Sequence, residues 1–165
     1  DWIPPLEDFI RAAYAAHVPV VGICFGHQII AQAMGGKVEK FAGGWTVGPT
    51  EYDFGDRIYT LNAWHQDQVV KKPEMAKVLA STAMCENAAL LYDDRIFTVQ
   101  PHPEFRKEFM AGLIQHRGPG LVPDALLADA TQRLDTTLDS PSMADRIAEF
   151  FLTHQAKSGA EKLRA

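Results

Sequence analysis

The hydrophobic pattern at the start of the chain alternates between helical and strand-like segments. Apolar residues recur at spacings of three and four in residues 4–16, which predicts an amphipathic helix. Residues 18–23 are β-branched and apolar without alternation, as expected of a strand buried on both faces. Helical spacing returns in residues 25–34, and the pair Gly35-Gly36 is a typical helix stop. The chain therefore opens as helix, buried strand, helix.

Strand patterns dominate the middle of the chain and helical patterns its end. The predicted strands are residues 50–54, 58–63, 77–81, 89–92 and 96–99, with Asp93-Asp94 turning the last two into a β-hairpin. The predicted helices contain Phe105, Phe109 and Leu113 at i, i+4 and i+8, residues 126–138, and a segment that Ser142 caps and that runs to Phe151. We expect one α/β domain over residues 1–165, with a largely parallel central sheet flanked by helices and a helical part from residue 106.

Composition and charge narrow the class of protein. The 165 residues include 16 Lys and Arg against 21 Asp and Glu, a net charge of −5 that disfavours nucleic-acid binding. Hydrophobic residues make up 47%, as in folded domains, and no apolar run is long enough to span a membrane. Two cysteines are too few for a disulfide framework, so we expect a reducing, cytoplasmic location. The start, Asp1-Trp2, lacks both Met and a signal peptide, and we expect the chain to begin inside a longer protein.

The segment Gly22-Ile23-Cys24-Phe25-Gly26 carries the most chemical information. It lies between the predicted buried strand and the next helix, so it has the pattern of a nucleophile elbow with Cys in place of Ser. Small residues two positions before and after the nucleophile avoid a collision at this tight turn. The helix N-terminus stabilises a thiolate, and the N–H of Phe25 is placed to stabilise an oxyanion.

A general base for this thiol is predicted at the end of the last strand. His102 lies between Pro101 and Pro103, which fix the backbone on both sides, and Glu104 follows two residues later. The carboxylate is placed to orient the imidazole as the third group of a triad. Cys24, His102 and Glu104 are therefore the predicted catalytic residues.

Together, these two motifs resemble the class I (Cys-His-Glu triad) glutamine amidotransferase family, in the branch of the glutaminase part of GMP synthase. The resemblance covers about residues 1–105 and includes the segment 65–69. It implies that Cys24 attacks the side-chain amide of glutamine and forms a γ-glutamyl thioester. It also implies that His102 transfers the proton and that Glu104 orients His102.

The resemblance further implies a substrate pocket. Gln28 and the backbone around Gln66 and Asp67 match positions that hold the amino-acid end of the substrate, and Phe25 matches half of the oxyanion hole. From the resemblance, we expect the family's N-terminal part, which supplies the other oxyanion donor, to precede the first residue here. Gln66 also replaces a Gly that is frequent in the GMP-synthase branch, which changes the shape of the pocket.

Other histidines and the second cysteine suggest no further chemistry. His65 is equally consistent with a pocket wall and a structural role, His27 with packing on its helix, and Cys85 with a core thiol. No metal-ligand spacing or nucleotide-binding loop occurs, so we expect no cofactor and no acceptor site for synthesis.

Three functions remain open. The chain is a glutaminase that works with a separate ammonia-accepting synthetase, a free-standing γ-glutamyl peptide or amide hydrolase, or a silent module that binds a ligand or partner. The first two differ in what contacts the face around Trp45, Trp64 and the C-terminal helices.

Overall fold

A computed structural model describes residues 1–162 of the chain. Five helices and eight strands follow one another in the described part: α1 (Ile3–Ala15), β1 (Val20–Ile23), α2 (Phe25–Ala33), β2 (Lys37–Lys40), β3 (Thr46–Asp53), β4 (Ile58–His65), β5 (Asp67–Lys71), β6 (Ala76–Thr82), β7 (Cys85–Tyr92), β8 (Ile96–Val99), α3 (Lys107–His116), α4 (Asp124–Gln132) and α5 (Ser140–Lys162). The α/β class and the β7–β8 hairpin agree with the sequence pattern. Strands β2 and β5, which pair with each other, were not predicted.

The central sheet has the order β1-β8-β7-β6-β3-β4 and is mostly antiparallel. Only the β1–β8 pair is parallel within the described residues, so the prediction of a largely parallel sheet is wrong. Short turns explain the difference: residues 54–57, 83–84 and 93–95 join successive strands, whereas a parallel pair needs a crossover of about a dozen residues or more. The single parallel pair nevertheless positions the site, because it aligns Ile23 with Val99.

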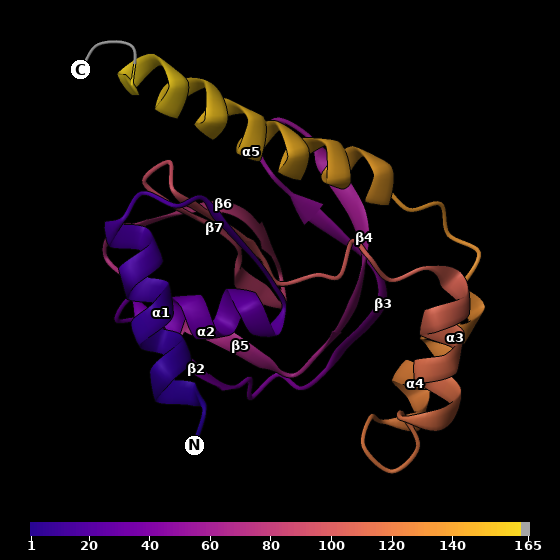
Figure 1. Cartoon of the computed structure of the whole chain (residues 1–165). Helices are drawn as coiled ribbons and strands as arrows, with labels where there is room; N and C mark the ends of the chain where they lie inside the picture. Colours follow the sequence, from indigo (N-terminus) through magenta and orange to yellow (C-terminus); the bar gives the residue numbers. More distant parts are fainter. Residues whose placement is uncertain (163–165) are drawn as a thin grey trace.

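Helices cover the two faces of the sheet. Helices α1 and α2 lie on one face and α5 runs along the other (Figure 1). Strand β8 contributes alternate residues to the two sides, with Ile96 in the core under α1 and α2, and Phe97 and Val99 in the core under α5. Because β8 is buried on both faces, the loop that follows it starts from a fixed point.

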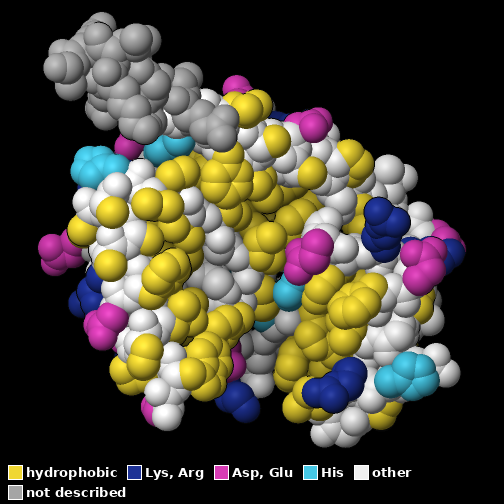
Figure 2. All heavy atoms as spheres, in the orientation of Figure 1, with side chains coloured by type: hydrophobic (Ala, Val, Ile, Leu, Met, Phe, Trp, Pro, Cys, Tyr) yellow, Lys and Arg dark blue, Asp and Glu magenta, His cyan; other side chains and the backbone are white. Residues whose placement is uncertain are grey.

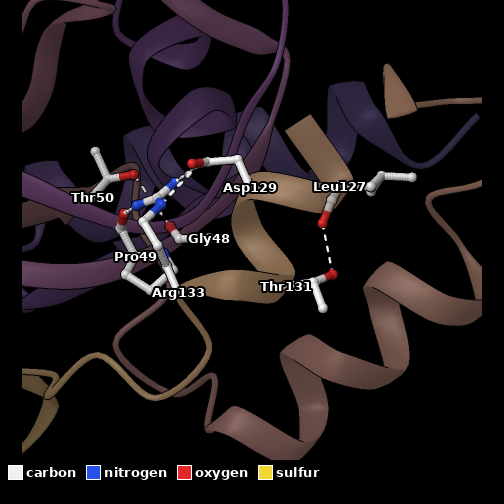
Figure 3. A network of polar contacts seen from close by, with 7 residues as sticks. All are labelled: Gly48, Pro49, Thr50, Leu127, Asp129, Thr131 and Arg133. Atoms are coloured by element: carbon white, nitrogen blue, oxygen red, sulfur yellow. Dashed lines mark hydrogen bonds and ion pairs between the residues drawn. The ribbon is translucent and has the colours of Figure 1, made fainter. Parts of the chain in front are cut away.

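Helices α3 and α4 form a separate layer against β3 (Figure 1). Gly48 on β3 has a φ of 83°, and a Cβ there would lie 3.0 Å from the Cβ of Ala130, so glycine allows the close approach of α4. Arg133 fixes the same contact by donating to the carbonyl of Pro49 and, through Nε at 2.8 Å, to Asp129 (Figure 3).

The C-terminal helices differ in extent from the sequence pattern. Helix α3 begins at Lys107, so Phe105 precedes it, and α4 ends at Gln132 rather than continuing to residue 138. Helix α5 begins at Ser140, two residues before the predicted cap Ser142. The weaker pattern of residues 133–138 is a connecting segment rather than helix.

Candidate active site

Cys24 lies at the turn between β1 and α2, in a backbone conformation that L-residues rarely adopt. Its φ is 49° and its ψ is −100°. A Cβ on Gly22 would lie 2.7 Å from the carbonyl carbon of Gly26, so the turn requires glycine at position 22. A Cβ on Gly26 would meet no atom within 4 Å, which corrects the expectation that both glycines are sterically needed. The strain at Cys24 is the type that clusters at functional sites.

Phe25 begins α2, so its N–H lies in the first turn of the helix, where N–H groups have no intrahelical acceptor. Its side chain is exposed and contacts Trp2, with ring centroids 5.6 Å apart. The backbone N–H, rather than the ring, is therefore the group of Phe25 expected to act at the elbow.

Three contacts hold His102, and a further hydrogen bond holds its neighbour Phe105. Its Nδ1 lies 2.6 Å from Oε1 of Glu104, and its ring stacks on Phe105 with centroids 3.7 Å apart and planes inclined by 7°. Its backbone N–H donates to the carbonyl of Asn62 at 2.8 Å. The Asn62 side chain in turn donates to the carbonyl of Phe105 at 3.0 Å. The ring contact and the Nδ1 contact therefore fix the orientation of the imidazole and leave Nε2 as the second ring nitrogen.

The charge on His102 is set by its neighbours. Burial alone would lower the pKa of His102. Its side-chain interactions with Cys24 and Glu104 outweigh this effect and raise the pKa from 6.5 to about 9. The His102 side chain is 13% exposed and that of Glu104 is 48% exposed. Glu104 therefore lies within hydrogen-bond distance of His102, and the raised pKa, to which Cys24 contributes, favours an imidazolium at this position.

Two side-chain amides, those of Gln28 and Gln100, connect Cys24 to the backbone of Asp67 through hydrogen bonds. Nε2 of Gln28 donates to the carbonyl of Asp67 at 2.8 Å and to Oε1 of Gln100 at 3.2 Å. Nε2 of Gln100 then donates to Sγ of Cys24 at 3.5 Å. Gln28 is therefore within reach of the predicted substrate segment, while the carbonyl of Gln66 accepts from the N–H of Phe41.

A cavity of about 300 Å³ opens beside Cys24. Its polar lining includes Gln28, Gln66 and Asp67, the three predicted substrate-binding residues. The remaining lining residues are Cys24, Lys40, Trp45, Trp64, His65 and Leu121. Figure 2 shows that the molecule is hollowed between the α1–α2 side and the α3–α4 side, with hydrophobic side chains on both walls. A cavity lined by apolar side chains together with a few polar groups is typical of a small-molecule site.

His27, His65 and Cys85 are buried. Burial lowers the pKa of His27 to about 3 and that of His65 to about 4, so both rings are neutral at pH 7. His27 packs as expected, with Nδ1 2.8 Å from Oγ1 of Thr98, whereas His65 lines the cavity. Cys85 is 2% exposed, and burial raises the pKa of its thiol to about 12. It is a core thiol, as the sequence indicated.

Comparison with known proteins decides the family. The family model described as glutamine amidotransferase class-I matches residues 3–113. The chain belongs to the class I glutamine amidotransferase family. A glutamine amidotransferase-like protein of Schizosaccharomyces pombe is 32% identical to it over 92% of this chain and 65% of its own length. Gamma-glutamyl peptidase 4 of Arabidopsis thaliana is 35% identical, over 69% of this chain and 51% of its own.

Two further comparisons relate the sequence to a GMP synthase and the fold to a solved amidotransferase structure. GMP synthase [glutamine-hydrolyzing] of Pseudomonas fluorescens is 36% identical over 65% of this chain and 24% of its own. The crystal structure of a glutamine amidotransferase from Methylobacillus flagellatus superimposes with a TM-score of 0.70 at 24% identity, over 94% of this chain and 69% of the other. The chain thus spans between a quarter and about two thirds of these relatives.

Three residues of the candidate site were not predicted from the sequence. Gln100 precedes Pro101 and His102 in the chain, yet nothing in the sequence indicated that its amide reaches the sulfur. Phe105 was assigned to a helical stripe, although it stacks on His102. Asn62 lies on β4, forty residues from His102, and only the isolated bridge between them reveals the connection.

The described residues contain neither a candidate metal site nor a candidate membrane-spanning helix. No group of three or more metal-ligating side chains gathers suitably for a metal ion in the described part of the chain. No helix within residues 1–162 is both long and apolar enough to cross a membrane.

Proposed function

We propose that the protein hydrolyses the side-chain amide of glutamine, or of a γ-glutamyl compound, with Cys24 as nucleophile. The observation that carries this proposal is the environment of His102: its Nδ1 lies 2.6 Å from Oε1 of Glu104, and interaction with Cys24 contributes to its raised pKa. A nucleophile, a base and an orienting carboxylate in this order form the covalent-catalysis pattern. The strained turn at Cys24 supports the same role.

The chemistry follows from the charge of the pair. The Cys24 thiolate attacks the γ-carbonyl carbon, and the N–H of Phe25 donates to the oxyanion that forms. The His102 imidazolium gives its proton to the leaving nitrogen as the carbon–nitrogen bond breaks, which leaves a γ-glutamyl thioester and neutral His102. Neutral His102 then takes a proton from water, whose oxygen attacks the thioester and releases glutamate and the Cys24 thiolate. The proton that His102 keeps restores the imidazolium.

We assign binding of the substrate's amino-acid end to the polar residues that line the cavity. Both hydrogens of the Gln28 amide nitrogen are used, by Asp67 and Gln100, so its Oε1 is the atom left to accept from a substrate ammonium. The Asp67 carboxylate, on an exposed residue that lines the cavity, adds negative charge beside that ammonium. Lys40, on the same lining, is placed to attract the α-carboxylate.

Two substrate classes fit this mechanism. If the substrate is glutamine, a separate synthetase accepts the released ammonia. A γ-glutamyl peptide or amide is the second candidate. The observation that favours it is the apolar wall of Trp45, Trp64 and Leu121, which provides room and contact area beyond the polar groups that glutamine needs.

A substrate panel tests the proposal. Glutamine, γ-glutamyl dipeptides with polar or aromatic second residues, and the matching α-glutamyl dipeptides are incubated with the protein, and released glutamate is measured. We expect glutamate from γ-linked compounds only, and none with Cys24→Ala. Release that persists in Cys24→Ala would contradict the mechanism, and binding of γ-glutamyl compounds by the wild-type protein without turnover would favour the silent module.

A further inference from the structure

Gln100 is a completely buried polar side chain whose contacts converge on the nucleophile. Its exposed fraction is 0%, and it directly follows β8. Its backbone N–H donates to the carbonyl of Ala88 at 2.8 Å, so its main chain is held within the sheet. Its side-chain amide then extends between Gln28 and Cys24 rather than toward solvent.

The parallel β1–β8 pair brings this side chain to the sulfur. The register aligns Ile23 with Val99, and the N–H of Cys24 donates to the carbonyl of Val99 at 2.9 Å. Gln100 is the next residue along β8, so the same pairing that fixes the backbone of Cys24 delivers an amide to its side chain. The alignment depends on sheet register and is independent of His102.

The direction of the hydrogen bonds is fixed by one backbone group. The carbonyl of Asp67 can only accept, so the Gln28 atom that lies 2.8 Å from it is the amide nitrogen. That nitrogen then donates to Gln100, whose contacting atom must be the oxygen. The other end of the Gln100 amide is therefore the NH₂ group, and it donates to Sγ of Cys24.

We propose that Gln100 is a further catalytic residue, which stabilises the Cys24 thiolate by donating a hydrogen bond to its sulfur, and that Gln28 holds the Gln100 amide in the donating orientation. This inference rests on the proposed nucleophilic role of Cys24. A donor at this position favours the charged sulfur over the thiol, because hydrogen bonds to ionised acceptors are about twice as strong as neutral ones. Gln28 thereby couples the substrate-binding segment at Asp67 to the nucleophile.

Two variants of Gln100 separate this role from simple packing. Gln100→Met keeps the length of the side chain but removes the donor, and Gln100→Glu places a carboxylate oxygen against the sulfur. The matched control is Gln68→Met, because Gln68 is also buried, at 3% exposure, but donates to the carbonyl of Met84. Each folded variant is reacted with iodoacetamide between pH 5 and 10, and modification of Cys24 is followed by mass spectrometry.

We expect the pH of half-maximal Cys24 alkylation to rise by about one unit in Gln100→Met and by more in Gln100→Glu, with about tenfold slower reaction below that pH. Gln68→Met should lower the melting temperature while keeping the wild-type profile. A folded Gln100 variant that keeps the wild-type profile would overturn the role of Gln100 and leave the proposed function intact. Wild-type Cys24 that reacts no faster than Cys85 would instead overturn the proposed function.

Discussion

Cys24 and Cys85 carry the same thiol at the ends of strands, but the surroundings of the two side chains differ in every respect that affects reactivity. Cys24 has a strained backbone, partial exposure, a histidine on one side and an amide donor on the other. Cys85 begins β7, is 2% exposed, and packs in the core with Tyr52 and Phe97. The difference shows that the turn geometry and the charged neighbours, rather than the thiol itself, define the candidate site.

The largest expected effect is on catalysis. Cys24→Ala and His102→Ala should each lower kcat by about four orders of magnitude or more, because members of a covalent catalytic unit fail together. Cys85→Ala should keep wild-type kcat. Initial rates of glutamate release on the best γ-glutamyl substrate measure this, with circular dichroism to check folding. Similar losses in Cys85→Ala and Cys24→Ala would remove the distinction between the two thiols.

A smaller loss is expected for Glu104→Ala. Glu104 lies 2.6 Å from Nδ1 of His102 and orients the ring without transferring the proton. We therefore expect the kcat of Glu104→Ala to be about tenfold to a hundredfold higher than that of His102→Ala, with little change in KM. Steady-state kinetics of the two variants side by side give the comparison. A Glu104→Ala enzyme as inactive as His102→Ala would indicate that the carboxylate takes part in proton transfer itself.

The pH profile should reflect His102 and not Cys85. The pKa of His102 is raised from 6.5 to about 9, so its charge stabilises the folded protein fully below pH 6.5 and ceases to do so as pH rises through about 9. Activity should decline above about pH 9, because neutral His102 has no proton for the leaving group. Glu104→Gln should move this decline to lower pH, as measured by kcat/KM from pH 5 to 10. An unmoved decline in Glu104→Gln would contradict this assignment.

Stability should rank the two cysteines in the reverse order. Cys85→Ser places a hydroxyl in a buried apolar cluster and should lower the free energy of unfolding by about 1–3 kcal/mol. Cys24→Ser, at a partly exposed turn, should change it by less than about 0.5 kcal/mol. Urea titrations of the two variants at pH 7 provide the values. Equal destabilisation would mean that Cys24 is also a packing residue.

The same contrast explains how much of the molecule could be predicted from sequence. The elbow at Cys24, the strand before it, the helix after it and the β7–β8 hairpin are local features, which short-range patterns encode. Sheet order and direction depend on which strands meet, and alternation of apolar residues carries no such information. Strand β2 was missed because Lys37–Lys40 is polar and mostly exposed.

The candidate site divides in the same way. Cys24, His102 and Glu104 were predicted from two motifs. Glu104 lies 2.6 Å from His102, and the catalytic roles of the three residues stay a prediction. Asn62 and Gln100 act through contacts across the sheet, which leave no pattern in one sequence. Phe105 continues a helical spacing so well that its stacking on His102 could be seen only in three dimensions.

Covalent labelling by a γ-glutamyl-directed electrophile tests the central claim most directly. Diazo-oxo-norleucine resembles glutamine and traps the nucleophile that attacks it, so the label reports both binding of the glutamyl group and reactivity of the thiol. We predict one adduct per chain, on Cys24, that excess glutamine prevents from forming and that His102→Ala slows strongly. Labelling of Cys85 alone, or labelling of Cys24 that glutamine does not slow, would contradict the account.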